Sequence, residues 1–300
     1  PLFNLAVSIL AIRLISDVWW GQFLELYILI SLISMITSFG NNEYLIREWS
    51  NNSQQIGQLW LDVLVARLPL LILCIPFLYI FLIPQSYWLV FIFWAISEFL
   101  YKSFNPIIVF NRKFGLSIVL NILSSAIIAT IIITNHSIIS VFQLAMTYGA
   151  LVFIKAIILL AHTKTHFTNT KSIAFNFPII VALYPFFFPS IIGFIQSQID
   201  TYVVAYKMPV DNLAQYHPLL KSFGMMHSLA FFAIAPFMKN IYRLNKKSIQ
   251  ILTYKFSIIG FLGAIAGIIS VYVLMRFYFK FHFPLTTYLL GYLQVVPLFI

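Results

Sequence analysis

Charged residues are scarce in this chain, and their scarcity decides its class. Only 9% of the 300 residues are charged, whereas 61% are hydrophobic and the mean hydropathy is +0.95. Soluble domains carry roughly 25% charged and 45–50% apolar residues. A soluble fold is therefore excluded, and we expect an integral membrane protein. Because the apolar runs are continuous and do not alternate with polar residues, the expected fold class is all-α, with helices that cross the bilayer.

Cysteine and the motifs of several enzyme classes are also lacking. The single cysteine, Cys74, lies in an apolar run and can form no disulfide within the chain. Neither a G-x-x-x-x-G-K-[ST] nucleotide loop nor an H-E-x-x-H zinc motif occurs, and the six histidines are scattered. We therefore expect no cofactor, no metal and no enzymatic activity. The net charge of +10 is interpreted as a topology signal and not as a nucleic-acid site.

Long apolar runs separated by polar segments are what the chain does contain. Crossing ~30 Å of hydrocarbon takes about 20 helical residues. The predicted spans cover about 1–16, 22–40, 60–83, 87–110, 116–134, 139–161, 177–205, 213–238 and 249–275, and a tenth starts near 284. Lys and Arg gather in the connections that follow even-numbered spans, so the positive-inside rule places these and the chain start in the cytoplasm. Both ends lie within apolar runs, and we expect a fragment of a larger protein.

A short internal repeat supports a two-part organisation. Ala11-Ile-Arg-Leu-Ile-Ser-Asp17 aligns with Ala205-Tyr-Lys-Met-Pro-Val-Asp211, and the period equals six spans, so both copies would have the same topology. Parallel repeats of this kind build many transporters around a central cavity. We therefore predict a first six-helix bundle over residues 1–165, a cytoplasmic linker over 166–176 and an incomplete second bundle over 177–300.

An acidic residue within one of the most apolar segments is the strongest functional signal. Asp200 and Gln196 share a helical face within predicted span 7, among Phe, Ile, Val and Tyr residues. An ionised side chain at membrane depth costs about 2.5–3.5 kcal/mol on insertion scales and usually marks a pathway. We interpret Asp200 as a cavity residue, either a counter-charge or a proton or cation site. An interhelical polar clamp is the alternative.

Several cationic residues also fall within predicted spans. We hypothesise that they form inner and outer rings around a cavity, with Arg13 the strongest candidate because guanidinium binds phosphate through two parallel hydrogen bonds. Arg67 has the alternative of reaching the headgroups or pairing with Asp62. The full set of cationic candidates is Arg13, Arg67, Lys102, Lys155, Lys221 and Lys255.

Structural explanations compete for some of these candidates. Lys155 and Lys255 lie only about six residues from predicted span ends, so their stems can reach the interface. Lys102 follows Glu98 by four residues, the favourable helical order for a local ion pair. An ion pair with Lys102 does not explain why Glu98 lies near the middle of a predicted span. We therefore keep Glu98 as a polar residue or ion-coupling candidate. Trp20, near a predicted outer span end, is assigned to the interfacial aromatic belt.

Two stretches resemble the polysaccharide flippases of the MOP superfamily, the Wzx-type O-antigen and capsule translocases. The opening AIRLISDVWWGQF with FGNNEYLIREWSN is similar to the first two spans of that family, and IQSQIDTYVVAYKMPVDNLAQYHPLLK to its seventh span and elbow. The chain departs from the pattern at Gln215, which stands where the first copy has Gly21, and in lacking the last two to four spans.

The resemblance implies both architecture and cargo. It implies two six-helix bundles that face each other across a cavity open to alternate sides. The implied cargo is an oligosaccharide on undecaprenyl diphosphate, moved from the inner to the outer leaflet of a bacterial cytoplasmic membrane. Implied partners are this lipid-linked oligosaccharide, the bilayer, and polymerase and chain-length proteins of the same pathway, with no nucleic acid.

Two other functions stay open. A membrane polymerase or ligase for lipid-linked oligosaccharides would share the composition, but it should carry a long outer loop with catalytic groups, and the predicted outer connections are short. A drug or cation antiporter of the same superfamily would share the fold. Several buried acids in the first half would favour the antiporter.

Overall fold

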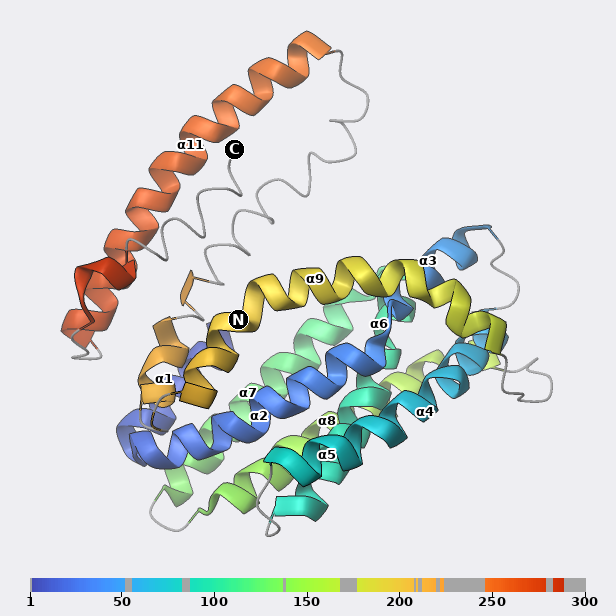
Figure 1. The fold of residues 1–300 in the computed structure, drawn as a ribbon, viewed down its shortest axis with the longest axis horizontal. Helices are drawn as coiled ribbons and strands as arrows, with labels where there is room; N and C mark the ends of the chain where they lie inside the picture. Colours follow the sequence, from blue (N-terminus) through green and yellow to red (C-terminus); the bar gives the residue numbers. More distant parts are fainter. Residues whose placement is uncertain are drawn as a thin grey trace. The chain divides into compact units, whose positions relative to one another are not determined.

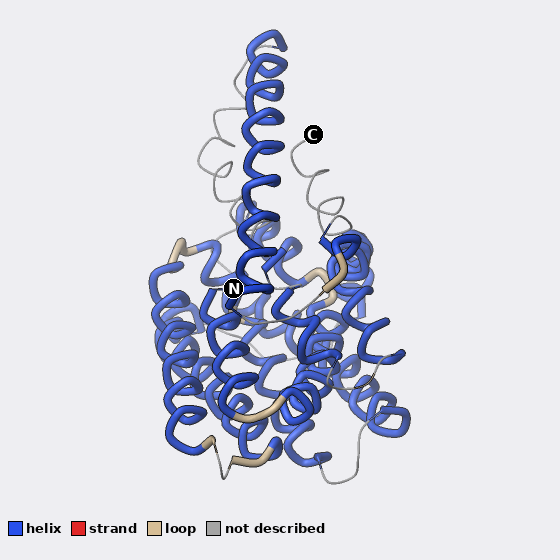
Figure 2. The backbone as a smooth tube through the Cα atoms, turned by 90° about the vertical axis from the view of Figure 1, so that its left-hand side faces the viewer, coloured by secondary structure: helices blue, strands red, loops and turns tan. Residues whose placement is uncertain are grey.

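The structure is a computed structural model that describes residues 2–51, 56–82, 87–136, 139–167, 177–207, 209, 212–219, 222–223, 246–278 and 283–288. Figure 1 shows the helices in chain order, and Figure 2 shows that the described residues form helices joined by short turns, without a strand. The predicted all-α fold class is therefore confirmed at this level.

Contacts divide the chain into two units, described separately below: residues 14–213, and residues 1–13 with 214–300. The 14–213 unit contains α2 (Asp17–Ser38), α3 (Asn41–Asn51), α4 (Ile56–Leu82), α5 (Trp88–Ser103), α6 (Asn105–Phe110), α7 (Phe114–Asn135), α8 (Val141–Thr163), the 3-10 helix η3 (Lys164–Phe167) and α9 (Phe177–Lys207). The other unit contains α1 (Leu2–Leu14) up to Arg13, α11 (Lys246–Val273) and the π-helical η4 (Leu274–Tyr278). The predicted bundles over 1–165 and 177–300 stay a prediction, and α9 packs with the helices that precede it.

Five helical segments of the described part are long and apolar enough to cross a membrane. They are Asp17–Asn51, which runs through α2 and α3, Ile56–Pro76, Phe114–Asn135, Val141–Thr163 and Thr253–Phe277. Their outward surfaces carry Ile, Leu, Val and Phe side chains that water would not solvate favourably. The chain thus has the features of a membrane protein.

Helix starts follow local capping chemistry that is visible in the sequence. Ser16 precedes α2, and its hydroxyl accepts a hydrogen bond from the Trp19 backbone nitrogen at 3.2 Å. Ser140 and Gln143 form a reciprocal capping box at the start of α8. Both arrangements satisfy backbone N–H groups that have no partner within the helix, which explains why these helices begin where they do.

Two predicted boundaries were wrong. The predicted span over 87–110 is divided into α5 and α6, because Pro106 stands in the first turn of α6 and cannot donate a ladder hydrogen bond. The segment with Arg47, predicted as a connecting loop, is the amphipathic helix α3, which buries Tyr44, Leu45 and Trp49 at helical spacing.

Among the described helices α5 and α8 share the most extensive contact, and α2 and α4 also pack against α5 (Figure 1). Aromatic rings fill the space between α2, α5 and α8. Trp20 stacks on Phe23 with ring centroids 4.9 Å apart, and Phe23 lies 5.7 Å from Trp94 and 5.0 Å from Tyr148. Trp20 is only 2% exposed, so its assignment to an interfacial belt was wrong. An indole with aromatic neighbours on adjacent helices gains more from packing than from the interface.

The α5–α8 pair depends on a glycine. A Cβ atom at Gly149 would lie 3.0 Å from Phe93 Cδ1 and 3.2 Å from Trp94 Cβ. Gly149→Leu is therefore expected to lower the free energy of unfolding by about 1–3 kcal/mol, the usual cost of overpacking. Thermal unfolding of the purified protein in detergent measures the change. Gly115→Leu in α7 is the control, since a Cβ there meets nothing within 4 Å; an equal loss in both variants would contradict the packing explanation.

The unit of residues 1–13 and 214–300 has a smaller core. Leu219, Phe223, Val271, Met275 and Tyr288 are buried together. Tyr272 and Tyr288 meet edge to face, with ring centroids 5.3 Å apart. These contacts join the end of α11 and η4 to short segments before and after them.

Candidate functional site

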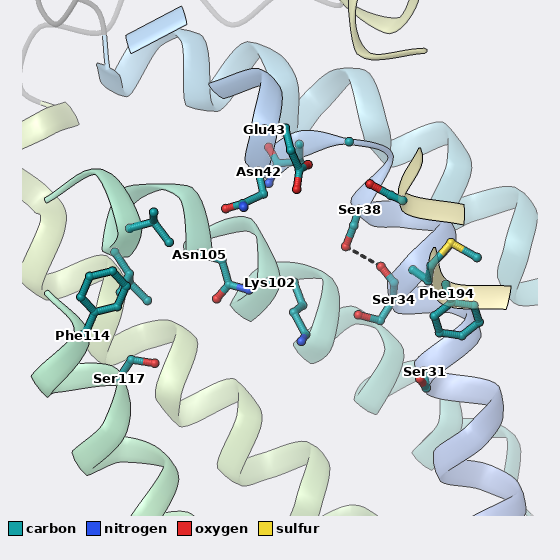
Figure 3. Close-up of a pocket in the computed structure, with 16 residues that line it drawn as sticks. Ser31, Ser34, Ser38, Asn42, Glu43, Lys102, Asn105, Phe114, Ser117 and Phe194 are labelled. Atoms are coloured by element: carbon teal, nitrogen blue, oxygen red, sulfur yellow. Dashed lines mark hydrogen bonds between the residues drawn. The ribbon is translucent and has the colours of Figure 1, made fainter. Parts of the chain in front are cut away.

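A cavity of about 580 Å³ with several polar side chains in its lining lies within the 14–213 unit (Figure 3). It is lined by α2, α3, α5, α6, α7 and α9, and hydroxyl and amide groups dominate its polar side chains. These polar side chains are Ser31, Ser34, Ser38, Asn41, Asn42, Glu43, Lys102, Asn105, Ser117 and Ser190. Polar groups at this density are unusual among helices otherwise built from Ile, Leu and Phe, and a concave site with convergent polar groups is the default binding site.

One wall is a row of serines on α2. Ser31, Ser34 and Ser38 recur at three- and four-residue spacing, which places them on one helical face. The Ser38 hydroxyl donates to the Ser34 carbonyl at 2.6 Å (Figure 3). This bond uses the hydroxyl proton and leaves the Ser38 oxygen lone pairs facing outward from the helix. The row is therefore able to accept hydrogen bonds from a ligand.

The α2–α3 corner forms the second wall. Phe39 and Gly40 both have positive φ, 43° and 72°, so the helix is interrupted between α2 and α3, and the first turn of α3 lines the cavity. Asn41 is 3% exposed, and the Oδ1 atoms of Asn41 and Asn42 are buried without a hydrogen-bond partner among the described residues. Buried unsatisfied acceptors cost about 1–3 kcal/mol each. Asn41 and Asn42 therefore bring amide groups, with both N–H donors and a carbonyl acceptor, to the edge of the cavity.

The cation of the cavity is Lys102, in the last turn of α5. Figure 3 places Lys102 between the serine row and the side of the cavity that carries Asn105 and Ser117. Its ammonium group is partly buried and bonds to no other residue in the described ranges. Glu98 lies one turn earlier, yet its Oε2 atom is buried without a hydrogen-bond partner within the described part of the chain. Lys102 is thus available to a ligand.

Lys155 belongs to a neighbouring polar cluster outside the cavity lining. Its Nζ atom donates to Asn121 Oδ1 at 3.2 Å and lies 4.5 Å from the centroid of the Tyr101 ring. Glu98 and Lys102 are close enough to interact with it electrostatically. The structure therefore brings Glu98, Lys102 and Lys155 together on α5 and α8, and only Lys102 lines the cavity.

Arg67 has a different environment from that predicted for it. Its side chain is 1% exposed and does not line the cavity. The guanidinium donates to the Val63 carbonyl at 3.2 Å, the Thr37 carbonyl at 3.1 Å and Ser103 Oγ at 2.8 Å. Asp62, the predicted ion-pair partner of Arg67, instead accepts a hydrogen bond from Gln58 Nε2 at 2.9 Å. Arg67 joins α2, α4 and α5.

For the remaining predicted residues, a place at this cavity stays a prediction. Arg13 lies in the last turn of α1 and Lys255 is an exposed residue of α11, both in the other unit. Gln196 and Asp200 lie on α9, but their side chains are outside the described structure, as is Lys221. Their predicted roles stay predictions.

Sequence reasoning missed the uncharged residues of the cavity. The serine row and the amides of Asn41, Asn42 and Asn105 carry no charge and attract no attention individually. A usable signal was present in the S-x-x-S-x-x-x-S spacing of α2, where three hydroxyls fall on one face of an otherwise apolar helix. Comparison of the chain with protein-family models, curated proteins and solved structures finds no match.

Proposed function

We propose that the chain is a flippase that carries an oligosaccharide linked to undecaprenyl diphosphate across a bacterial cytoplasmic membrane, by alternating access. The proposal rests on the resemblance of two stretches to the MOP superfamily. The observation that carries it is the cavity of about 580 Å³ among apolar helices, with Lys102 beside hydroxyl and amide groups. Such a cavity has the polar groups that an oligosaccharide needs at a depth where the bilayer supplies none.

The architecture that accompanies this proposal is two parallel six-helix repeats around a central cavity. The start of the chain would lie on the cytoplasmic side, as the distribution of Lys and Arg predicts. Movement of the two bundles against each other would expose the cargo site to the inner and outer leaflets in turn. In this scheme Arg13, Lys255, Lys221 and Asp200 keep the roles in the cargo path that the sequence predicts for them.

Lys102→Ala is expected to lower the flipping rate about 10- to 100-fold, since a charge-assisted hydrogen bond contributes about 1.5–3 kcal/mol. The measurement is the transfer of lipid-linked oligosaccharide between leaflets of proteoliposomes. Lys102→Arg should retain part of the rate because it keeps the charge. Lys164→Ala removes an exposed lysine outside the cavity and is the control. Unchanged flipping by the Lys102→Ala protein would remove the cavity from the proposed path.

A genetic test addresses the cargo directly. Deleting the gene should make undecaprenyl-linked oligosaccharide accumulate on the inner leaflet, and complementation with the Arg13→Ala or Asp200→Ala variant should leave it there. Export at the normal level in the deletion strain would exclude the flippase proposal. Normal export with both variants would exclude only their assigned roles.

A drug or cation antiporter is the second candidate. Two acidic residues favour it. Glu43 lines the cavity, and Glu98 Oε2 is buried without a hydrogen-bond partner in the described ranges. Uptake of a fluorescent organic cation against an ion gradient, abolished by Glu43→Gln, would support this candidate over the flippase.

A further inference from the structure

We propose that the cavity between α2, α3, α5 and α9 is a sugar subsite, which binds hydroxyl and N-acetyl groups of the cargo and not its diphosphate. This inference rests on the proposed function and deepens it. Three independent features of the cavity carry it: the balance of hydrogen-bond donors and acceptors, the net charge, and the aromatic rings in the lining.

The polar lining offers both hydrogen-bond acceptors and donors. The Ser38 and Ser190 hydroxyls donate their protons to the Ser34 and Phe186 carbonyls, at 2.6 and 2.9 Å, so their oxygens can accept from a ligand. Asn41 and Asn42 each hold a buried Oδ1 atom without a partner in the described structure. The Asn amides also carry N–H donors, so the lining presents donors and acceptors side by side. Sugar hydroxyl and amide groups likewise both donate and accept, whereas an ionised phosphate oxygen only accepts.

The charge of the lining also favours a neutral sugar over a diphosphate. Lys102 and Glu43 are the charged side chains of the cavity, and their formal charges cancel. A diphosphate with about two negative charges would be left uncompensated between low-dielectric helices, which is unfavourable. The nearby cations are engaged elsewhere, Arg67 with Thr37 and Ser103, and Lys155 with Asn121. Lys102 can donate to the ring or hydroxyl oxygens of a neutral sugar.

Aromatic and apolar side chains complete the lining. Phe194 on α9 and Phe114 on α7 lie on different sides of the cavity (Figure 3). Sugar rings have apolar C–H faces that pack favourably on aromatic rings, whereas a diphosphate has none. A mixed lining of amides, hydroxyls and phenyl rings therefore fits an amphipathic sugar better than an inorganic anion.

Thiol protection tests the ligand class. Ser38→Cys, in a Cys74→Ala background, places a single reporter thiol in the cavity, and Ser50→Cys on α3 places one outside it. The purified chain is treated with a methanethiosulfonate reagent in the presence of undecaprenyl diphosphate, or of the same lipid carrying N-acetylglucosamine. We expect the sugar-bearing lipid at saturation to slow modification of Ser38→Cys at least about fivefold, because occupancy excludes the reagent. The bare lipid should have no such effect, and neither ligand should protect Ser50→Cys.

Asn41→Leu provides a second readout. Replacing a buried, unsatisfied amide by a similar-sized apolar group is expected to leave the thermal unfolding temperature equal or higher, while the protection by the sugar-bearing lipid is lost. A purely structural role for Asn41 would instead lower the unfolding temperature and leave protection intact.

The outcomes separate this inference from the flippase proposal. Equal protection by both lipids, or by neither, overturns the sugar subsite. Selective protection by the sugar-bearing lipid in a chain that does not flip it would support the subsite and exclude the flippase. Flipping of the sugar-bearing lipid together with equal protection by both lipids would support the flippase and overturn the sugar subsite.

Discussion

Replacing Arg67 by alanine is expected to lower the free energy of unfolding by at least about 3 kcal/mol, the largest single effect in the 14–213 unit. The buried guanidinium donates to the Thr37 carbonyl and to Ser103 Oγ, on two different helices, and its Cζ atom lies 5.1 Å from the centroid of the Phe99 ring. Alanine removes these hydrogen bonds, leaves the Thr37 carbonyl near the end of α2 without its donor, and creates a cavity where three helices meet.

Two further substitutions at this site separate volume from hydrogen bonding. Arg67→Met keeps much of the apolar volume and should be less damaging than alanine, since removing a buried charge also removes its desolvation cost. Arg67→Lys keeps the charge but cannot reproduce the planar fork that reaches two helices, so it should also destabilise. Thermal unfolding in detergent gives the order of the variants.

The control for this series is Arg47→Ala. Arg47 is an exposed arginine of α3 whose Cζ atom lies 5.8 Å from the Phe186 ring centroid, so its loss should cost less than about 1 kcal/mol. If Arg67→Ala unfolded at the wild-type temperature yet abolished transport, Arg67 would belong to the cargo path and the structural role would be wrong.

Gly40→Ala is expected to destabilise the same unit by about 3 kcal/mol and to disturb the cavity. A Cβ atom at Gly40 would lie 2.6 Å from Phe186 Cβ and 2.8 Å from the backbone nitrogen of Phe187, distances that no rotamer change relieves. The φ of 72° adds about 1–2 kcal/mol of strain for a residue with a side chain. Relief requires α9 to move away from the α2–α3 corner, and α9 carries Ser190 and Phe194 of the cavity lining.

Unfolding temperature and reporter labelling together test the Gly40 prediction. The variant should unfold at a lower temperature, and its Ser38→Cys thiol should react faster because the cavity opens. Gly263→Ala in α11 is the control, since a Cβ there meets nothing within 4 Å. A Gly40→Ala protein with both wild-type stability and wild-type labelling would show that the corner tolerates a side chain.

Much of the helical pattern was accessible from the chain alone. Predicted spans at about 116–134, 139–161 and 177–205 correspond to α7, α8 and α9 within a few residues, because the length of an apolar run is set by the thickness of hydrocarbon. The amphipathic helix α3 was not predicted, because its sequence lacks the uniform hydrophobicity of a membrane span. Its apolar residues occupy one face only, which a helical-period search would have detected.

The candidate site was only partly accessible. Lys102 was predicted and lines the cavity, whereas Arg67, predicted on the same grounds, is buried in a contact among α2, α4 and α5. Both are cations within apolar runs, and nothing in the run itself distinguishes them. The amides and hydroxyls of the lining were overlooked, since an uncharged polar residue becomes informative only when others lie beside it.

Composition and apolar run length by themselves determined that this is an all-helical membrane protein with polar side chains at unusual depth. Only the tertiary structure decided which of those side chains share a cavity and which are consumed in helix packing. The physical reason is that hydropathy depends on each residue alone and sets the depth of a helix in the bilayer. The direction in which a side chain points depends on helix rotation, which the neighbouring helices set through close contacts such as those at Gly40 and Gly149.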